Sequence, residues 1–308
     1  MRQKILQVLE KVAEKNKKII FIGSDLGPKT LINFKKKFPE RFFMEGAAEQ
    51  HIISMARGFA KEGFIPYINT ISTFLTRRCY EQILLDMSFQ NSKIRLIANG
   101  GGLVYAPLGN THLATDDIGL MKLIPNMAVL VPADEIEMEK MVKKTVNYPY
   151  PIFFRVAKGN DPVLTDKIYK NFKLGNFYKY GQGDILIFTT GITLGIGLKV
   201  RDQLKSLRIN TAVVHSPTLK PINTKQLKMI TNNAKYIFTI EEHKIIGGLG
   251  STISQFIAEN FSKKLKKFKI IALPDAYLKG YGRQHEMMKR YKLDSKSCFD
   301  LIKKELKK

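Results

Sequence analysis

The chain alternates short apolar runs with longer amphipathic stretches along most of its length. In the first half, apolar runs that fit buried strands cover 18–23, 64–70, 93–99, 127–133 and 151–156. Stretches with helical spacing lie between or beside them, at 4–15, 47–61, 72–90, 116–123 and 134–146. This alternation predicts βαβ units and a mostly parallel sheet.

The pattern weakens where glycine, proline and polar residues become frequent, and then it resumes. Further strands are expected at 184–190, 210–216, 235–242 and 269–274, with helices at 194–206, at 224–231, after the glycines of 247–250 and from about 296. We therefore expect an α/β fold of two doubly wound domains, at 1–160 and 183–308, joined by a linker at 161–182.

Composition narrows the class of protein. The 308 residues suffice for about two domains, and 44% hydrophobic residues exclude a disordered chain. No apolar run approaches the roughly 20 residues that span a bilayer, and the N-terminus lacks a signal-peptide core, so a cytoplasmic protein is expected. The two cysteines, Cys79 and Cys298, provide neither a disulfide framework nor a zinc site.

The net charge of +24, from 51 basic and 27 acidic residues, is large. Lysines supply most of it and are spread along the chain rather than gathered in one segment. We interpret this as a solvated lysine-rich surface, with attraction of anionic ligands or of an acidic partner protein as the alternative. Nucleic-acid binding is not expected, because such proteins usually concentrate their basic residues on one face.

The stretch most informative about chemistry covers 43–82. Glu49 begins an otherwise apolar helix there, and small residues at 46–48 allow a backbone or a ligand to approach closely. Taken alone, Glu49 is only a favourable acid in a first helical turn. The residues around Glu49 are more specific, because the sequence there is GAAEQH, followed further on by STFLTRRCYEQ.

These stretches resemble the pyrimidine-binding domain of thiamine-diphosphate enzymes of the transketolase group. GAAEQH matches the signature G-x-x-E-Q-[HN], and STFLTRRCYEQ is similar to the corresponding part of 1-deoxy-D-xylulose 5-phosphate synthase. Further blocks resemble the group in the same order, namely GSDLGPKT, FPERFFMEGAAEQ, LGNTHLATDDIGLMKLIPNMAVLVPAD, LKPIN and IFTIEEHKIIGGLGS. The resemblance covers nearly the whole chain and implies a pyrimidine-binding domain followed by a transketolase C-terminal domain.

The resemblance implies cofactor-binding roles for five residues. Glu49 matches the glutamate that hydrogen-bonds the aminopyrimidine ring of thiamine diphosphate and is catalytic, a role that suits a buried acid. Phe74 matches the aromatic side chain that stacks on this ring. Ile71 and Arg77, three positions to either side of Phe74, are expected on the same helix face. Asp25 falls in the loop that faces the cofactor in relatives.

The same resemblance implies how substrate is held. His112 matches the catalytic histidine that faces the reacting carbonyl. Phosphate contacts are implied for Arg155, Lys29 and Arg2. Leu108 and Leu113 replace polar residues that flank the histidine in sugar-phosphate transketolases, which implies an altered donor or acceptor. His243 is expected to order the C-terminal domain rather than to catalyse.

The family binds the cofactor's diphosphate through a divalent metal held by a GDG…N motif on another domain, and no GDG occurs in this chain. The resemblance therefore implies a C-terminal subunit that shares thiamine diphosphate with an N-terminal, diphosphate-binding transketolase subunit. That partner would hold the Mg²⁺ or Ca²⁺, and this chain would supply no metal ligand. An α2β2 heterotetramer is expected, with no nucleic-acid or membrane partner.

The implied reaction is transfer of a two-carbon ketol unit between sugar phosphates, carried out only with the partner subunit. GGGLVYAPLGNTH is similar to transketolase-like proteins of envelope-polysaccharide sugar pathways. Three alternatives stay open. Two are enzymes: a subunit like 1-deoxyxylulose-5-phosphate synthase that uses pyruvate, and one like the β subunit of a 2-oxo-acid dehydrogenase. The third is a non-catalytic basic binding protein that has kept the fold.

Overall fold

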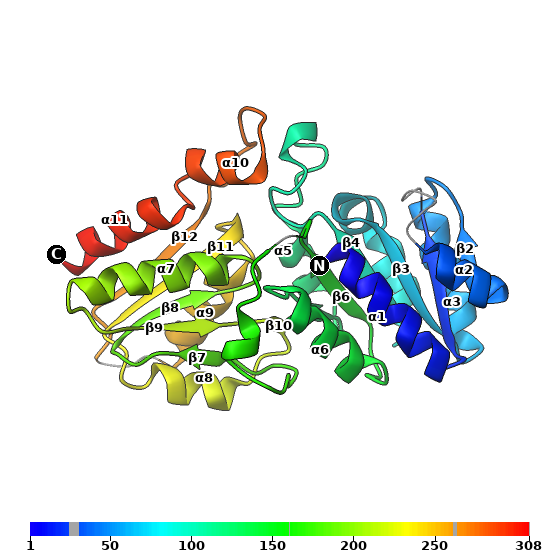
Figure 1. Ribbon diagram of the computed structural model, residues 1–308, viewed down its shortest axis with the longest axis horizontal. Coiled ribbons are helices and arrows are strands. Elements are labelled where there is room, and N and C mark those ends of the chain that lie inside the picture. Colours follow the sequence, from blue (N-terminus) through cyan, green and yellow to red (C-terminus); the bar gives the residue numbers. More distant parts are fainter. Residues whose placement is uncertain (25–30, 160, 261–263, 308) are drawn as a thin grey trace.

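The computed structural model describes residues 1–24, 31–159, 161–260 and 264–307. It has two lobes that lie side by side, each built on a central sheet covered by helices (Figure 1). Both sheets are mainly parallel, and the strands expected from the longer apolar runs are present in each. The predicted α/β class with two doubly wound domains is confirmed.

The first lobe holds a seven-stranded sheet. Its order is β10 (Thr218–Lys220), β5 (Ala128–Leu130), β6 (Ile152–Val156), β4 (Arg95–Asn99), β3 (Ile65–Ile71), β1 (Ile19–Gly23) and β2 (Phe42–Met44). Successive residues of β1 enter different cores, with Ile20 and Ile22 on one face and Ile19 and Phe21 on the other. Burial on both faces explains why these parallel strands read as continuous apolar runs.

Helices cover both faces of this sheet. α1 (Arg2–Lys15) and α6 (Glu135–Thr145) pack on one face, and α3 (Glu49–Lys61) and α5 (Asp117–Leu123) on the other. α1 is placed by its apolar stripe, and α6 begins where the Asp134 carboxylate accepts the backbone N–H groups of Ile136 and Glu137. Shorter helical segments are α2 (Ile32–Lys37), α4 (Tyr80–Gln82), η1 (Pro39–Arg41), η4 (Ala106–Leu108) and η5 (Thr165–Lys167).

The second lobe holds a five-stranded sheet in the order β12 (Lys267–Leu273), β11 (Tyr236–Lys244), β8 (Ile185–Thr189), β9 (Thr211–His215) and β7 (Tyr178–Tyr180). Its helices are α7 (Thr193–Ser206), α8 (Thr224–Thr231), α9 (Leu249–Glu259), α10 (Gln284–Arg290) and α11 (Ser295–Leu306). β7 pairs antiparallel with β9 and falls inside the range expected as a linker. Three residues are too few to give a period-two signal in the sequence.

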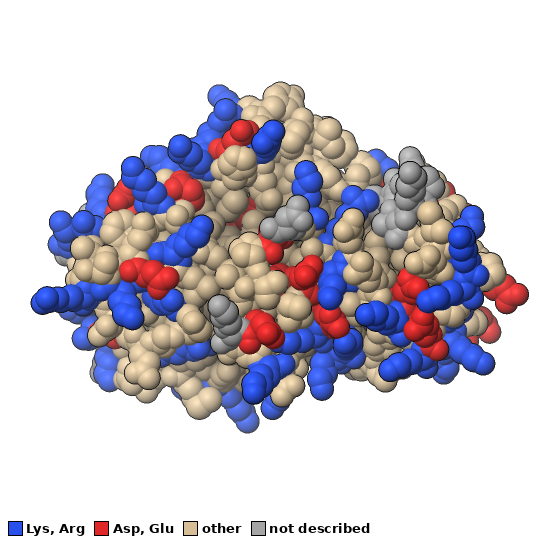
Figure 2. All heavy atoms as spheres, viewed as in Figure 1, with Lys and Arg blue, Asp and Glu red and all other residues tan. Residues whose placement is uncertain are grey.

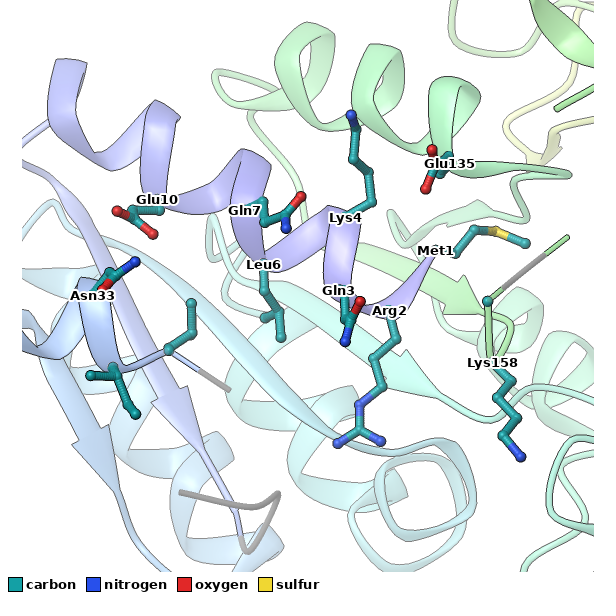
Figure 3. A pocket seen from close by; sticks show the side chains of 13 residues that line it. Met1, Arg2, Gln3, Lys4, Leu6, Gln7, Glu10, Asn33, Glu135 and Lys158 are labelled. Atoms are coloured by element: carbon teal, nitrogen blue, oxygen red, sulfur yellow. The ribbon is translucent and has the colours of Figure 1, made fainter. Parts of the chain in front are cut away.

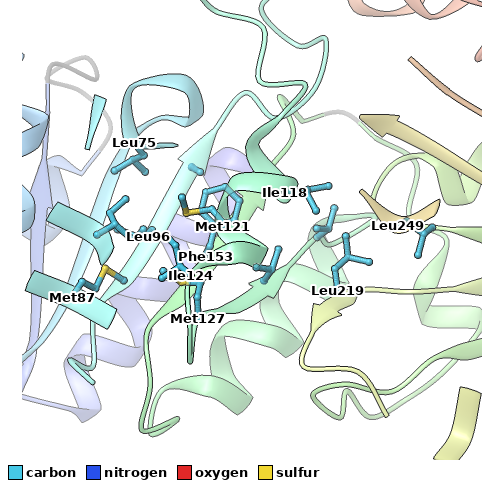
Figure 4. Close-up of a cluster of buried hydrophobic side chains, with 14 of the residues drawn as sticks. Leu75, Met87, Leu96, Ile118, Met121, Ile124, Met127, Phe153, Leu219 and Leu249 are labelled. Atoms are coloured by element: carbon cyan, nitrogen blue, oxygen red, sulfur yellow. The ribbon is translucent and has the colours of Figure 1, made fainter. Parts of the chain in front are cut away.

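The two lobes share one core, because β10 crosses from the second half of the chain into the first sheet. It pairs antiparallel with β5, where no strand was expected. Leu219, at the centre of β10, lies in a hydrophobic cluster that runs from Met87 and Phe153 in the first lobe to Leu249 in the second (Figure 4). The lobes are therefore joined by main-chain pairing and by continuous apolar packing.

Lys and Arg side chains cover both lobes on the face seen in Figure 2, with acidic side chains between them. On this face the positive charge is spread out rather than gathered over one element. No helix within the described residues is long and apolar enough to cross a membrane.

Shortening Leu219 tests how tightly the lobes are coupled. Leu219 is 2% exposed, so Leu219→Ala is expected to lower the free energy of unfolding by about 2–5 kcal/mol. Leu123→Ala is the control, because this leucine is 74% exposed and its removal should cost less than about 0.5 kcal/mol. Urea unfolding followed by circular dichroism measures both. Two separate transitions in the wild-type chain would contradict the shared core.

Candidate functional site

Three of the sequence-predicted residues, Glu49, Phe74 and His112, converge on the carboxyl edge of the first sheet, where open α/β sheets usually bind ligands. α3 begins at Glu49, shortly after β2 ends, and Phe74 follows shortly after β3. His112 lies in the loop after β4. Because β2, β3 and β4 run parallel, the three chain segments that follow them lie at the same edge of the sheet.

Glu49 is a buried carboxylate that, within the described residues, pairs with the cation of Arg78. It is 2% exposed, and its Oε2 accepts a hydrogen bond of 2.6 Å from Nη1 of Arg78. Its helix buries Ile52, Ile53 and Ala56 against the sheet, which fixes the direction of the first turn. The helix N-terminus favours negative charge at this position. Arg78 was not expected to contact Glu49.

Phe74 begins a π-helical segment, η2 (Phe74–Arg78), within the range 72–90 that was expected to be one α-helix. A π turn closes between residues i and i+5, so residue i+4 lies beside residue i and residue i+3 is rotated away. Accordingly Arg78 lies over the Phe74 ring, at 4.5 Å from the guanidinium carbon to the ring centroid. A second π segment, η3 (Ile83–Ser88), follows α4.

The prediction that Ile71, Phe74 and Arg77 share one helix face is wrong, because the segment is a π turn that begins only at Phe74. Ile71 is the last residue of β3 and precedes the helical segment. Arg77 turns toward the loop after β4, where Nε and Nη2 bind the Asp116 carboxylate at 3.1 and 2.9 Å. Nη2 also donates to the carbonyl of Leu113 at 2.8 Å. Arg77 therefore anchors the loop that carries the predicted catalytic histidine.

His112 is half-buried and lies against Phe74. Their ring centroids are 5.3 Å apart, and a second aromatic residue, Tyr105, lies 6.5 Å from the imidazole. Nδ1 of His112 pairs with the Thr111 hydroxyl at 2.9 Å. Contacts thus run from Glu49 through Arg78 and Phe74 to His112, so three predicted residues form one cluster.

The glycine run after β4 lets side chains approach the backbone. Gly100 and Gly102 have φ of +80° and +69°. A Cβ at 100, 101 or 102 would collide with Tyr105, Arg155 or Glu242 respectively. The space beside these three glycines is therefore filled by this chain's own side chains.

Arg155 lies inside the junction of the two lobes. It is 6% exposed, and its Nε donates to Oδ2 of Asp117 at 2.8 Å. Its Nη2 donates to the carbonyls of Ala114 and Glu242 at 3.1 and 2.9 Å. Its predicted contact with a substrate phosphate stays a prediction, because internal acceptors hold the guanidinium here.

Arg2 lines a pocket of about 960 Å³ beside the first turn of α1, together with Lys4 and Lys158. The Arg2 and Lys158 side chains extend to the same side of this turn (Figure 3). Glu10 and Glu135 also line the pocket, so it is not uniformly basic. The predicted residues Asp25 and Lys29 lie outside the described residues.

His243 orders the junction of the lobes. It is buried on β11, and its Nε2 accepts the backbone N–H of Gly119 at 3.2 Å while Nδ1 pairs with the carbonyl of Lys244 at 2.8 Å. Burial lowers the pKa of His243 below its ordinary 6.5. The neighbouring Glu242 accepts from the backbone N–H of Leu103 at 2.9 Å, and burial raises its pKa to about 6.

Two family models match the chain: the transketolase pyrimidine-binding domain over 1–162 and the transketolase C-terminal domain over 178–298. The chain belongs to the transketolase family. Its two lobes are the corresponding domains of that family. Among the residues that the structure describes, no group of three or more His, Cys, Asp or Glu could hold a metal ion.

This transketolase-family chain is similar to proteins of two kinds. A Methanocaldococcus jannaschii protein named as a putative transketolase C-terminal section is 31% identical, over 100% of this chain and 96% of that protein. The 1-deoxy-D-xylulose-5-phosphate synthase of Halothermothrix orenii is also 31% identical, over 96% of this chain and 46% of the synthase. The chain spans less than half the length of that synthase.

Solved structures agree with the family. One described as a split gene transketolase, inactive beta4 tetramer, superposes with a TM-score of 0.87 at 27% identity, covering 98% of this chain and 97% of that one. The Campylobacter jejuni transketolase superposes with a TM-score of 0.77 at 17% identity, over 98% of this chain and 46% of that one, and supports the fold alone.

Four residues of the site region lie outside the sequence predictions: Arg78, Tyr105, Asp117 and Glu242. The pair of arginines in STFLTRRCYEQ contained a signal for Arg78, but choosing between them requires knowing that the turn is a π turn. Tyr105 follows the glycine run, where an aromatic side chain in a loop has no periodicity to mark it. Asp117 and Glu242 meet only when the two lobes pack.

Removing the Arg77 side chain tests its role as a loop anchor. Arg77→Ala should speed hydrogen exchange at the His112 backbone N–H, which is held by the Gly109 carbonyl at 3.0 Å. Exchange followed by mass spectrometry measures this. Arg201→Ala is the control, because Arg201 pairs with its neighbour Asp202 in the other lobe. Unchanged exchange at 105–116 would contradict the anchoring role.

The buried His243 predicts a pH dependence of stability. Below about pH 6.5 the unfolded chain takes up a proton at His243 and the folded chain does not, so stability falls as pH falls. His243→Gln should reduce the loss of unfolding free energy between about pH 8 and pH 5.5. Denaturant titrations at both pH values test this. The exposed His51, changed to Gln, is the matched control and should leave the loss as in wild type.

Proposed function

We propose that this chain is the C-terminal subunit of a heteromeric transketolase that depends on thiamine diphosphate and transfers a two-carbon ketol unit between sugar phosphates. The observation that carries the proposal is the buried Glu49 carboxylate beside the Phe74 ring, at the carboxyl edge of the first sheet. The similarity to a transketolase C-terminal section and to a split gene transketolase supports a separate N-terminal partner.

The donor set around Glu49 fits an aminopyrimidine. A carboxylate sheltered from water can share a proton with a ring nitrogen, and Phe74 offers an aromatic face for stacking. When bound, thiamine diphosphate supplies an acidic thiazolium carbon for making and breaking carbon–carbon bonds next to a carbonyl. Glu49 would hold the proton at the pyrimidine nitrogen, and Phe74 would orient the ring.

His112 is proposed to act on the substrate side of the cluster. Because Nδ1 pairs with Thr111, Nε2 is the nitrogen that would meet a substrate oxygen and donate or accept a proton there. Arg77 holds the His112 loop through Asp116, and is proposed to act on the cofactor through this loop. Arg2 and Lys158 in the pocket beside α1 are proposed to attract the substrate phosphate.

The partner subunit is proposed to bind the diphosphate and its Mg²⁺ or Ca²⁺, in an α2β2 heterotetramer. A reaction like that of 1-deoxy-D-xylulose 5-phosphate synthase is the second candidate, favoured by the 31% identity over 96% of this chain. Leu108, 53% exposed, replaces a polar residue of sugar-phosphate transketolases, and this replacement leaves both candidates open. The two candidates differ in the donor, which is a ketose phosphate in one and pyruvate in the other.

Glu49→Gln tests the site in the complex of this chain with its partner. It should abolish turnover, a loss of at least about 100-fold, because the amide cannot hold the shared proton. Glu62→Gln is the control, since Glu62 is exposed at the opposite end of the same helix. Turnover is measured with xylulose 5-phosphate and with pyruvate as donors. Wild-type turnover by the Glu49 variant would mean that the assignment of the site to Glu49 is wrong.

A further inference from the structure

The guanidinium of Arg78 makes the two contacts that the proposed function assigns to the aminopyrimidine ring. It donates a hydrogen bond to Oε2 of Glu49 at 2.6 Å, and it lies over the Phe74 ring at 4.5 Å. A guanidinium suits both contacts, because it is planar, donates in its own plane and stacks on aromatic faces. It therefore offers the same two surfaces as a flat nitrogen heterocycle.

We propose that Arg78 occupies the pyrimidine subsite in the free chain and is displaced when the cofactor binds. The inference rests on the proposed function, since it takes Glu49 and Phe74 as the subsite. A ring stacked on Phe74 and bonded to Glu49 needs the space between these residues, and the guanidinium fills it. Arg78 and the ring are thus mutually exclusive occupants.

The exposures of the two ion-pair partners indicate which one moves. The Arg78 side chain is 46% exposed and that of Glu49 is 2% exposed. Within the described residues, Glu49 supplies the hydrogen bond that holds Arg78, and Phe74 supplies its ring contact. A half-exposed arginine can return to water readily, whereas a buried carboxylate cannot be left without a partner. Arg78 therefore leaves, and Glu49 stays.

The π turn places this cation without disturbing the loop anchor. Arg78 is the last residue of η2 and lies over Phe74, its first residue, while the adjacent Arg77 is committed to Asp116. The Arg78 side chain can move while the Arg77 contacts keep the His112 loop in place. Displacement is thus confined to one side chain.

When Arg78 occupies the subsite, the cofactor cannot bind there. The apparent Kd of the cofactor is therefore raised, because only the chains with an open subsite can bind it. Removing Arg78 should therefore tighten cofactor binding in the complex, even though a cation near the diphosphate-bearing cofactor has been lost. A residue that instead contacts the bound cofactor would show the opposite effect. The sign of the change separates the two roles.

The experiment titrates thiamine diphosphate with Mg²⁺ into the complex of this chain and its partner, followed by calorimetry. Arg78→Ala is expected to lower the Kd at least about threefold. Arg57→Ala is the matched control, because Arg57 is on the neighbouring helix α3 and bonds Gln90 at 3.3 Å. Its Kd should match wild type. An unchanged or raised Kd for Arg78→Ala overturns the inference.

A second measurement uses the free chain and no cofactor. Arg78→Ala leaves Glu49 buried and unpaired, so the Tm of the variant chain should fall, and adding Glu49→Gln should restore part of the loss.

If Arg78→Ala does not fold, Arg78→Lys replaces it, since lysine keeps the charge and loses the planar contact. A smaller decrease in the Kd for thiamine diphosphate is then expected. If the Tm changes of Arg78→Ala and Glu49→Gln simply add in the double variant, the interaction between Arg78 and Glu49 is absent and the inference is overturned. A wild-type complex that binds no thiamine diphosphate overturns the proposed function as well.

Discussion

The buried guanidinium of Arg155 is the interaction on which the arrangement of the two lobes depends. It extends from the end of β6 and is bonded to the Asp117 carboxylate, to the carbonyl of Ala114 and to the carbonyl of Glu242 on β11. One cation thereby connects the first sheet, the start of α5 and the second sheet. Losing it would leave Asp117 as an unpaired buried charge, which is far costlier than losing a surface pair.

The same junction shapes the candidate site, although the site residues come from the first lobe. The loop between β4 and α5 is held at its glycine run by Arg155 and Glu242, through close approaches that only glycine permits. It is held again near its end by Arg77. His112 lies between these anchors, so its position against Phe74 depends on the packing of the second lobe.

The sequence predicted the long elements well because each has a periodic signal. Parallel strands such as β6 are buried on both faces and read as apolar runs, whereas β2, β7 and β10 are three-residue strands whose pairing is decided by tertiary packing. The residues that motif resemblance selected, Glu49, Phe74 and His112, lie in one cluster in the structure. The resemblance could not place Arg77 or Arg78, because assigning a helix face assumes α-helical spacing, and this turn is π-helical.

The buried carboxylate of Glu49 explains why a cation lies beside it. Under the proposed function Glu49 is sheltered so that it can share a proton with a ring nitrogen, yet a sheltered carboxylate is unfavourable unless something donates to it. Some group must therefore donate to this carboxylate, and in the structure that group is the Arg78 guanidinium. Arg78 meets this requirement because a guanidinium bonds in its plane and stacks on its face, and so it keeps Glu49 and Phe74 in the geometry that the ring itself would need.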